Sequence, residues 1–420
     1  MKLYNLLALL SSSFPVSLRI YLPLLSFLLK KIEAFTPDID STIASFAKFC
    51  FIRIIRHFEG KARVQKPGVN EICCIQNLEQ LTIKVLLPHH LSPSRSSPSS
   101  GIQCLLESYT TVGEVLTYVL EKMEIVVKSC YYGLYLFVDK NGEMEQHLLD
   151  EDDNIMDVIN HCENDREDFL QRVTTPKKPG FNSLWYYDYH IVIQLKIFYK
   201  LNPNDMEGHI FYFSQLASLL FLSLTPLPSL SILVKLISLS ILIKFGSYEE
   251  GKEENLQGKI NLEDFLPKNF KPSEGTSHDF LEKAIEGYIG LGGVGKEEAV
   301  KMFVDTLRGE EIFCIHQFSI DYTKINENSE SPKINAILVV CPEGIKIFEK
   351  KNGKKIIQLN YKEILKWGLG KGKTSLLLVG EGGEQYFCEG GECRVINYCM
   401  NAYVNLTLGR GIDFENDRKG

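Results

Sequence analysis

The strongest chemical signal in the sequence is a glycine-rich segment, Gly290–Lys296 (GLGGVGK). It matches the G-x-G-x-x-G dinucleotide pattern and the G-x-x-x-x-G-K part of a P-loop, whose backbone amides cradle phosphate at the start of a helix. Both motifs require a strand before the glycines, whereas residues 278–290 have a helical period. The next residue is Glu297, where a P-loop has Ser or Thr to hold magnesium. The segment therefore favours a connector between two helices, with a phosphate-binding enzyme as the alternative.

Other arrangements of reactive residues do not form a catalytic or metal site. The nine histidines lack metal-ligand spacing, and no serine lies in a nucleophile-elbow sequence. The acidic run Asp150–Asp153 lacks the EF-hand pattern and is typical of a solvated helix start. Cys388 and Cys393 are next to Glu389 and Glu392, which disfavour a reactive thiolate. We expect no enzyme activity, no metal and no cofactor.

Composition and charge narrow the class of protein. The 420 residues are 45% hydrophobic and 24% charged, an ordinary globular balance, and their number predicts two to four domains. The eleven cysteines are scattered without paired two-residue spacing, which indicates reduced thiols and a cytosolic compartment. Residues 1–70 carry ten Lys and Arg against four acidic residues, whereas 139–168 carry twelve acidic residues. This asymmetry, with a net charge of −7, disfavours nucleic acid as a partner.

Two apolar tracts have more than one interpretation. The first residues, MKLYNLLALLSSSF, have a weak secretory-signal pattern. Residues 210–234 contain no charge and are long enough to span a bilayer, but Pro226, Pro228 and Gln215 disfavour a membrane helix. A buried helix followed by an irregular insertion is the alternative.

Hydrophobic periodicity predicts the order of the elements. Residues 41–58 form an amphipathic helix, and 81–88 and 102–109 form strands. Thr111 and Glu114 predict the capping of a helix that ends near residue 125, before a strand at 131–139, a further strand and a short helix. Helices at 278–290 and 296–308 follow, and seven strands between 313 and 388 precede a helix at 393–408. The first part has the order of a ubiquitin-like roll and the last that of a pleckstrin-homology-like barrel.

A roll, a helical lobe and a barrel in this order resemble the three lobes of a FERM domain. The resemblance rests on TTVGEVLTYVLEKMEI in the first lobe, FGSYEEGK and LEDFLP in the second, and FCIHQFSIDY at the start of the third. Upstream, residues 43–72 are similar to the closing part of a myosin tail homology 4 domain, which precedes FERM in unconventional myosins and plant-type kinesins. The resemblance implies an α+β multidomain fold whose helical lobe is acyl-CoA-binding-protein-like, and no motor sequence is present.

The resemblance divides the chain into six segments. They are an unassigned apolar segment (1–28), a partial tail homology domain (29–79), a ubiquitin-like lobe (80–200), a helical lobe with an insertion near 222–235 (201–308), a pleckstrin-homology-like lobe (309–409) and a tail (410–420).

The resemblance also implies three binding surfaces. The family's peptide groove, in which a partner strand adds to the fifth barrel strand beside the closing helix, falls here on Lys366, Trp367, Gly368, Leu369, Ile396, Met400 and Tyr403. Trp367 as ordinary core is the alternative. Anionic lipid or acidic partners would meet Lys350, Lys351, Lys354 and Lys355, which are otherwise a solvated hairpin tip. A surface used toward acidic microtubule tails falls on Arg53, Arg56, Lys61 and Arg63.

These observations predict a non-enzymatic adaptor that links the cytoskeleton or a motor to cytoplasmic tails of membrane proteins or to cargo adaptors. Microtubules, actin-linked proteins and anionic lipid are further predicted partners. The predicted location is the cytoplasm, at the cytoskeleton or the inner face of the plasma membrane. A peripheral phosphoinositide-binding protein is the alternative with the same architecture.

Overall fold

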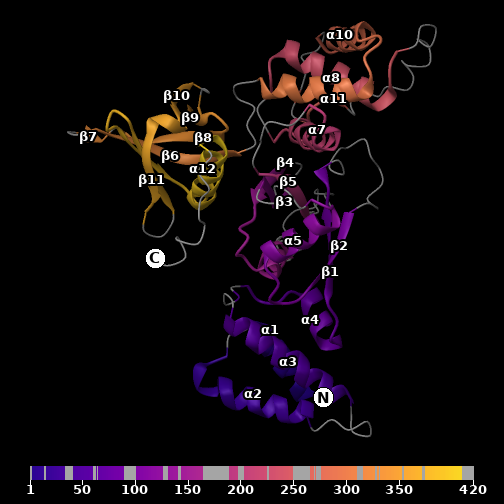
Figure 1. Ribbon diagram of the computed structural model, residues 1–420, viewed down its shortest axis with the longest axis vertical. Coiled ribbons are helices and arrows are strands. Elements are labelled where there is room, and N and C mark those ends of the chain that lie inside the picture. The colour runs from indigo at the N-terminus through magenta and orange to yellow at the C-terminus, as the bar shows by residue number, and fades with distance from the viewer. Residues whose placement is uncertain are drawn as a thin grey trace, which may run out of the picture. The chain divides into compact units, whose positions relative to one another are not determined.

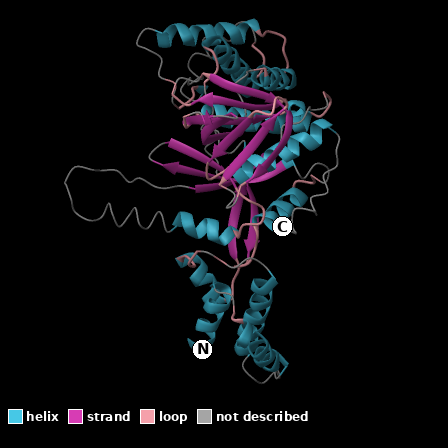
Figure 2. Ribbon diagram, turned by 90° about the vertical axis from the view of Figure 1, so that its left-hand side faces the viewer, coloured by secondary structure: helices cyan, strands magenta, loops and turns pink. Residues whose placement is uncertain are grey.

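The computed structural model divides into two compact units, which are described separately. Unit 1 comprises Met1–Leu87 with Ser97–Ile193, and unit 2 comprises Pro88–Ser96 with Gln194–Gly420. The structure describes residues 2–13, 16–33, 41–59, 63, 65–88, 101–125, 131–140, 143–163, 189–196, 203–224, 227–248, 265–268, 270, 276–309, 316–326, 329–330, 332–351, 354–370 and 374–408. Figure 2 distinguishes the helix-rich and strand-rich parts by colour.

Unit 1 begins with four helices: α1 (Lys2–Ser13), α2 (Leu18–Glu33), α3 (Ser41–Glu59) and α4 (Val69–Asn77). Helix α3 packs against α1 and α2, and α4 packs against α1 (Figure 1). Their shared core consists of Ala8, Leu28, Phe46, Ala47, Cys50, Ile54 and Ile75. The stripe predicted for 41–58 is thus the packing face of α3. Segment 1–28, which the sequence left unassigned, contributes Ala8 and Leu28 to the same core.

A five-stranded sheet forms the rest of unit 1. Its strands are β1 (Leu81–Leu86), β2 (Gly101–Leu106), β3 (Tyr132–Lys140), β4 (Glu143–Leu148) and β5 (Tyr189–Leu195). Their order is β2-β1-β5-β3-β4, with β1 and β5 parallel, and helix α5 (Val112–Lys122) packs against β2 and β3. The predicted capping box is present, because Thr111 Oγ1 accepts from the Glu114 amide and the Glu114 carboxylate accepts from the Thr111 amide. The predicted order of strands and helices is confirmed, and β5 is an additional strand.

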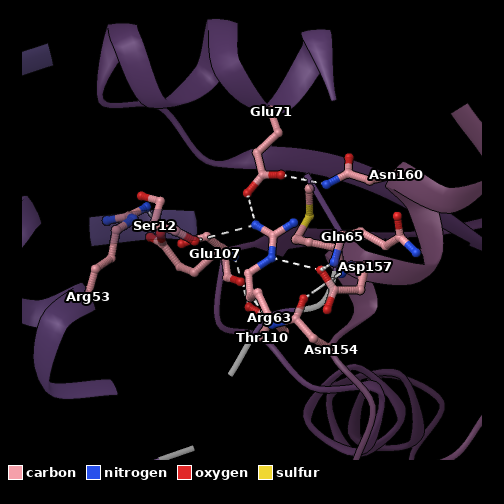
Figure 3. A network of polar contacts seen from close by, with 12 residues as sticks. Ser12, Arg53, Arg63, Gln65, Glu71, Glu107, Thr110, Asn154, Asp157 and Asn160 are labelled. Carbon is pink, nitrogen blue, oxygen red and sulfur yellow. Dashed lines mark hydrogen bonds and ion pairs between the residues drawn. The ribbon is translucent and has the colours of Figure 1, made fainter. Parts of the chain in front are cut away.

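A buried polar network connects the helices of unit 1 to its sheet domain (Figure 3). The Arg63 guanidinium pairs with Glu71 of α4, donates from Nε to Asp157 Oδ1 at 2.9 Å, and contacts the carbonyl oxygen of Ser12 in α1. Asn160, in the helix at 155–163, donates to the second Glu71 oxygen at 2.7 Å. Burial disfavours the charged guanidinium, but the bonds to Glu71 and Asp157 outweigh it and raise the Arg63 pKa.

Four helices form the first part of unit 2: α7 (Met206–Phe221), α8 (Leu230–Phe245), α10 (Thr276–Gly290) and α11 (Lys296–Arg308). Helix α8 packs against α10 and α11, and α7 packs against α11. The apolar tract 210–234 is shared between α7, a connector and α8. Within the described ranges, no helix has the length and hydropathy that a bilayer crossing requires. The segment 222–235, predicted to be an irregular insertion, is partly helical: α8 begins at Leu230, and Leu233 is buried.

Gln215, the polar residue within that apolar tract, has a structural role. Its amide oxygen accepts from the Leu195 N–H at 2.8 Å, and its amide nitrogen donates to the Leu195 carbonyl at 2.9 Å. The side chain therefore satisfies both backbone groups at the end of β5, as a neighbouring strand would. Ser218, one turn later, donates to the Pro88 carbonyl at 2.7 Å.

The second part of unit 2 is an antiparallel sheet closed by one helix. Its elements are β6 (His316–Asn326), β7 (Ser329–Glu330), β8 (Ile334–Cys341), β9 (Gly344–Glu349), β10 (Lys355–Asn360), the 3₁₀ turn η4 (Tyr361–Glu363), β11 (Ile364–Leu369), β12 (Ser375–Gly380), β13 (Gln385–Glu389) and α12 (Cys393–Leu408). The strand path is β10-β9-β8-β6-β13-β12-β11, and β7 pairs with β6. The seven predicted strands and the bounds of the closing helix are confirmed.

Replacing Arg63 tests whether the buried network stabilises unit 1. The Arg63→Met variant leaves the carboxylates of Glu71 and Asp157 without their cation, so we expect a loss of about 3–5 kcal/mol. Native-state hydrogen exchange of α4 amides measures this opening free energy. Arg56→Met, at an exposed position, is the matched control and should change it by about 0.5 kcal/mol at most. Equal effects of the two substitutions would contradict the assignment.

Candidate functional site

Strand β11 is the open edge of the barrel sheet beside α12. It pairs with β12 on one side, and among the described residues no strand pairs with its other side. Helix α12 packs against β8, β11 and β12 (Figure 1). An edge strand presents unpaired N–H and C=O groups along its outer side, which an extended chain can satisfy.

The side chains of β11 alternate between two faces. Trp367 pairs with Leu378 and Leu369 pairs with Leu376, and both partners are fully buried, so Trp367 and Leu369 point to the inner face. Both are only half-buried, and no strand among the described residues covers the outer edge of β11. Trp367 is thus neither fully core nor fully surface, and with Leu369 it provides apolar surface along the open edge.

The outer face of β11 carries exposed Lys366 and Gly368. A Cβ atom at Gly368 would meet no heavy atom within 4 Å, so the space above this position is open. Leu365 lies in a β-bulge without a cross-strand partner, and 63% of its surface is exposed. The bulge that exposes Leu365 has no signal in the residue types.

The three α12 residues predicted to line the groove are part of the core. Ile396 and Met400 are fully buried, and Tyr403 is 2% exposed. The Tyr403 ring stacks on Tyr361 with centroids 6.4 Å apart, and the Tyr361 hydroxyl donates to the Cys341 carbonyl at 2.9 Å. Burial raises the pKa of Tyr361 far above its ordinary value, so the phenol stays protonated. These residues hold α12 on the barrel, so the prediction that they line a groove is corrected: they belong to the core.

The four predicted lysines lie at the β9–β10 hairpin, where β10 is the other end of the strand path. All four side chains are exposed. Lys350 Nζ donates to Ser319 Oγ at 3.2 Å, and Lys355 Nζ donates to Gln358 Oε1 at 3.0 Å. The predicted turn residues Asn352 and Gly353 lie outside the described residues. The strand order of the sheet begins with β10 and ends with β11, so these lysines and the β11 edge belong to opposite ends of that order.

Two of the four residues predicted for a basic surface, Arg53 and Arg63, are buried inside unit 1. Arg53 pairs with Glu107, and Arg63 pairs with Glu71 and Asp157, so both guanidinium groups are buried (Figure 3). Burial lowers the pKa of Arg53, and the charge of Glu107 partly opposes this shift. Arg56 is exposed, and Lys61 lies outside the described residues. The microtubule prediction is therefore wrong for Arg53 and Arg63, because both charges are used inside the fold.

The glycine segment connects two helices, as predicted. Helix α10 ends at Gly290 and α11 begins at Lys296. The amides of Leu291, Gly292 and Val294 donate to carbonyls of the preceding turn at 3.0–3.2 Å and are not directed at a ligand. Gly293 has φ +86°, a backbone conformation that favours glycine. Glu297 and Glu298 in the first turn of α11 place negative charge where a phosphate would bind.

Comparison with known proteins identifies the fold. No protein-family model and no curated protein matches the sequence. Among solved structures, the chain is similar to the MyTH4-FERM MF1 domain of Dictyostelium discoideum myosin VII, with TM-score 0.69, 17% identity, and coverage of 97% of this chain and 75% of that chain. The MF2 domain of the same myosin gives TM-score 0.66 and 15% identity, with coverage of 97% and 75%.

A third solved structure is the C-terminal MyTH4-FERM domain of human myosin 7b in complex with the harmonin-a PDZ3 domain. It gives TM-score 0.57 and 15% identity, covering 96% of this chain and 74% of that chain. At such identities the likeness concerns the fold alone. The predicted α+β architecture of three FERM lobes preceded by a tail homology helical domain is confirmed.

Two substitutions test which half of the predicted groove is core. Ile396→Ala removes a fully buried side chain and should destabilise the barrel by about 2–5 kcal/mol. Leu365→Ala on the exposed bulge should change stability by about 0.5 kcal/mol at most. Urea denaturation of both variants measures the difference. A large loss for Leu365→Ala with none for Ile396→Ala would reverse the assignment.

Proposed function

From the MyTH4-FERM fold of this chain, we propose that it is a non-enzymatic adaptor that docks partner proteins through the β11 edge. The single observation that carries the proposal is an open edge strand whose exposed and half-buried side chains are Leu365, Trp367 and Leu369. An extended partner segment adds as a further strand, with its main chain paired to β11 and its apolar side chains on Trp367 and Leu369. Helix α12 supports the edge from the barrel side.

Charge near the edge indicates the chemistry of the partner segment. Lys366 on β11 and Lys362 in η4 are both exposed. An extended segment with apolar residues and an acidic flank fits this surface, because its carboxylates would approach the lysines while its backbone pairs with β11. Cytoplasmic tails of membrane proteins and segments of cargo adaptors are the proposed sources. The link to a cytoskeletal motor is proposed from the myosin VII domains whose fold this chain has.

The lysine hairpin supports a contribution from an anionic partner. Lys351 and Lys354 are exposed on either side of one turn, and Lys350 and Lys355 extend the charge along β9 and β10. Several exposed lysines at one hairpin attract anionic lipid headgroups, with about 1 kcal/mol from each lysine near the surface. We therefore place the working location of the protein at the cytoplasmic face of a membrane or at the cytoskeleton.

Peptide binding tests the adaptor function directly. Immobilised synthetic tail peptides with alternating apolar residues and an acidic flank serve as probes in biolayer interferometry. Leu365→Asp and Trp367→Ala should each weaken binding by about tenfold or more. Peptides with proline at alternate positions should fail to bind because they cannot donate ladder hydrogen bonds. Binding that tolerates both variants and the proline peptides would remove β11 as the docking edge.

Vesicle binding tests the hairpin separately. Replacing Lys351 and Lys354 together by Gln should weaken binding to phosphoinositide-containing vesicles by about thirtyfold at physiological salt. Leu365→Asp is the matched control and should leave vesicle binding unchanged. If the lysine double variant sediments with vesicles as the unaltered chain does, the hairpin is only a solvated turn.

A further inference from the structure

The ubiquitin-like lobe of unit 1 has its own open edge, and a pocket lies beside it. Strand β2 is an end strand of the five-stranded sheet, and in the described part of the chain only β1 pairs with it. Helix α5 packs against β2. A pocket of about 290 Å³ lies at this edge and is lined by Cys104, Leu105, Tyr109, Val115 and Tyr118, among others.

The lining combines a buried floor with exposed apolar walls. Cys104 and Val115 are each 2% exposed, whereas Leu105 is 64% and Tyr118 is 40% exposed. Cys104 pairs with Ile83 and Leu105 with Thr82 across the β1–β2 ladder, so the two side chains point to opposite faces. An added strand would therefore alternate its side chains between the face of Cys104 and the face of Leu105, and both of these residues line the pocket.

The size and polarity of the pocket fit side chains better than a cofactor. Its volume is at the lower limit of the roughly 300–1,000 Å³ typical of small-molecule sites. Burial raises the pKa of the Cys104 thiol to about 11, so the floor is uncharged at neutral pH. One or two apolar side chains of an extended segment match both the small volume of the pocket and its uncharged floor.

Two cations flank the pocket. The Arg56 guanidinium lies 5.7 Å from the Tyr109 ring centroid, and Lys122 Nζ lies 5.4 Å from that of Tyr118. Glu107 pairs with Arg53, whereas Glu114 lines the pocket itself and accepts from the Thr111 amide. The two cations outnumber this one lining carboxylate, so the rim favours negative charge at the ends of a bound segment.

We propose that the β2 edge is a second docking site, which binds by strand addition an extended partner segment whose alternating apolar residues are flanked by acidic residues. The site is independent of the β11 edge in unit 2. A strand side without a partner among the described residues, an adjoining pocket and a flanking pair of cations meet at this one edge.

The test uses fluorescein-labelled Asp-Asp-Val-Thr-Val-Thr-Val-Asp-Asp and a counterpart with lysines in place of the aspartates, in anisotropy titrations with the full chain. We expect the acidic peptide to bind saturably with a dissociation constant below about 1 mM. The lysine peptide should bind about tenfold more weakly. In the Leu365→Asp background, which lacks docking at β11, Leu105→Asp and Tyr118→Ala, both at exposed positions, should each weaken binding of the acidic peptide by about fivefold or more. In the same background, the Arg56→Glu, Lys122→Glu double substitution should reverse the preference.

Leu365→Asp separates this site from the proposed function, because it removes docking at β11 and leaves the β2 edge intact. Acidic-peptide binding that survives Leu365→Asp but is lost in the Leu365→Asp, Leu105→Asp double variant supports the second site. Absence of saturable binding in chain that remains folded by circular dichroism overturns it. Binding lost in Leu365→Asp and retained in both Leu105→Asp and Tyr118→Ala also overturns it, and assigns the peptide to β11.

Discussion

An open β-sheet has two edge strands, and the unpaired N–H and C=O groups of each edge must be covered or left for a partner. This constraint organises both units of the chain. At the end of β5, the Gln215 side chain satisfies the Leu195 backbone in the way a strand would. At β11, in contrast, no strand of the described part of the chain pairs with the outer side, and α12 packs beside it. The sites proposed here are therefore places where sheet hydrogen bonding is incomplete.

Basic residues that form buried ion pairs within the fold are not available to bind partner proteins. Arg53 and Arg63 lie in the most basic part of the sequence, yet their partners Glu107 and Asp157 are 54 and 94 residues away. Moving a charged side chain out of water costs several kcal/mol, and a nearby carboxylate offsets this cost only if the geometry of the ion pair is good. Both arginines therefore fix the N-terminal helices against the ubiquitin-like lobe of unit 1. In unit 2, four exposed lysines lie together at the β9–β10 hairpin.

Local signals predicted most elements, and long-range contacts account for the errors. The Thr111 and Glu114 pattern fixed the start of α5, and the strand periodicity located the barrel. Strand β5 was missed because its neighbours β1 and β3 are distant in sequence. Ile396, Met400 and Tyr403 recur at helical spacing, which is the ordinary signature of a core-facing stripe, and they are buried. The exposure of Leu365 depends on a bulge that residue types do not reveal.

The most direct test of the account is amide hydrogen exchange of β11 in the full chain, with and without a saturating acidic-flanked tail peptide. Outward-facing amides of Ile364–Leu369 should exchange rapidly in the free chain and become protected in the complex, since the peptide supplies the missing ladder bonds. Protection confined to other strands, with β11 amides unchanged under saturation, would contradict docking at this edge.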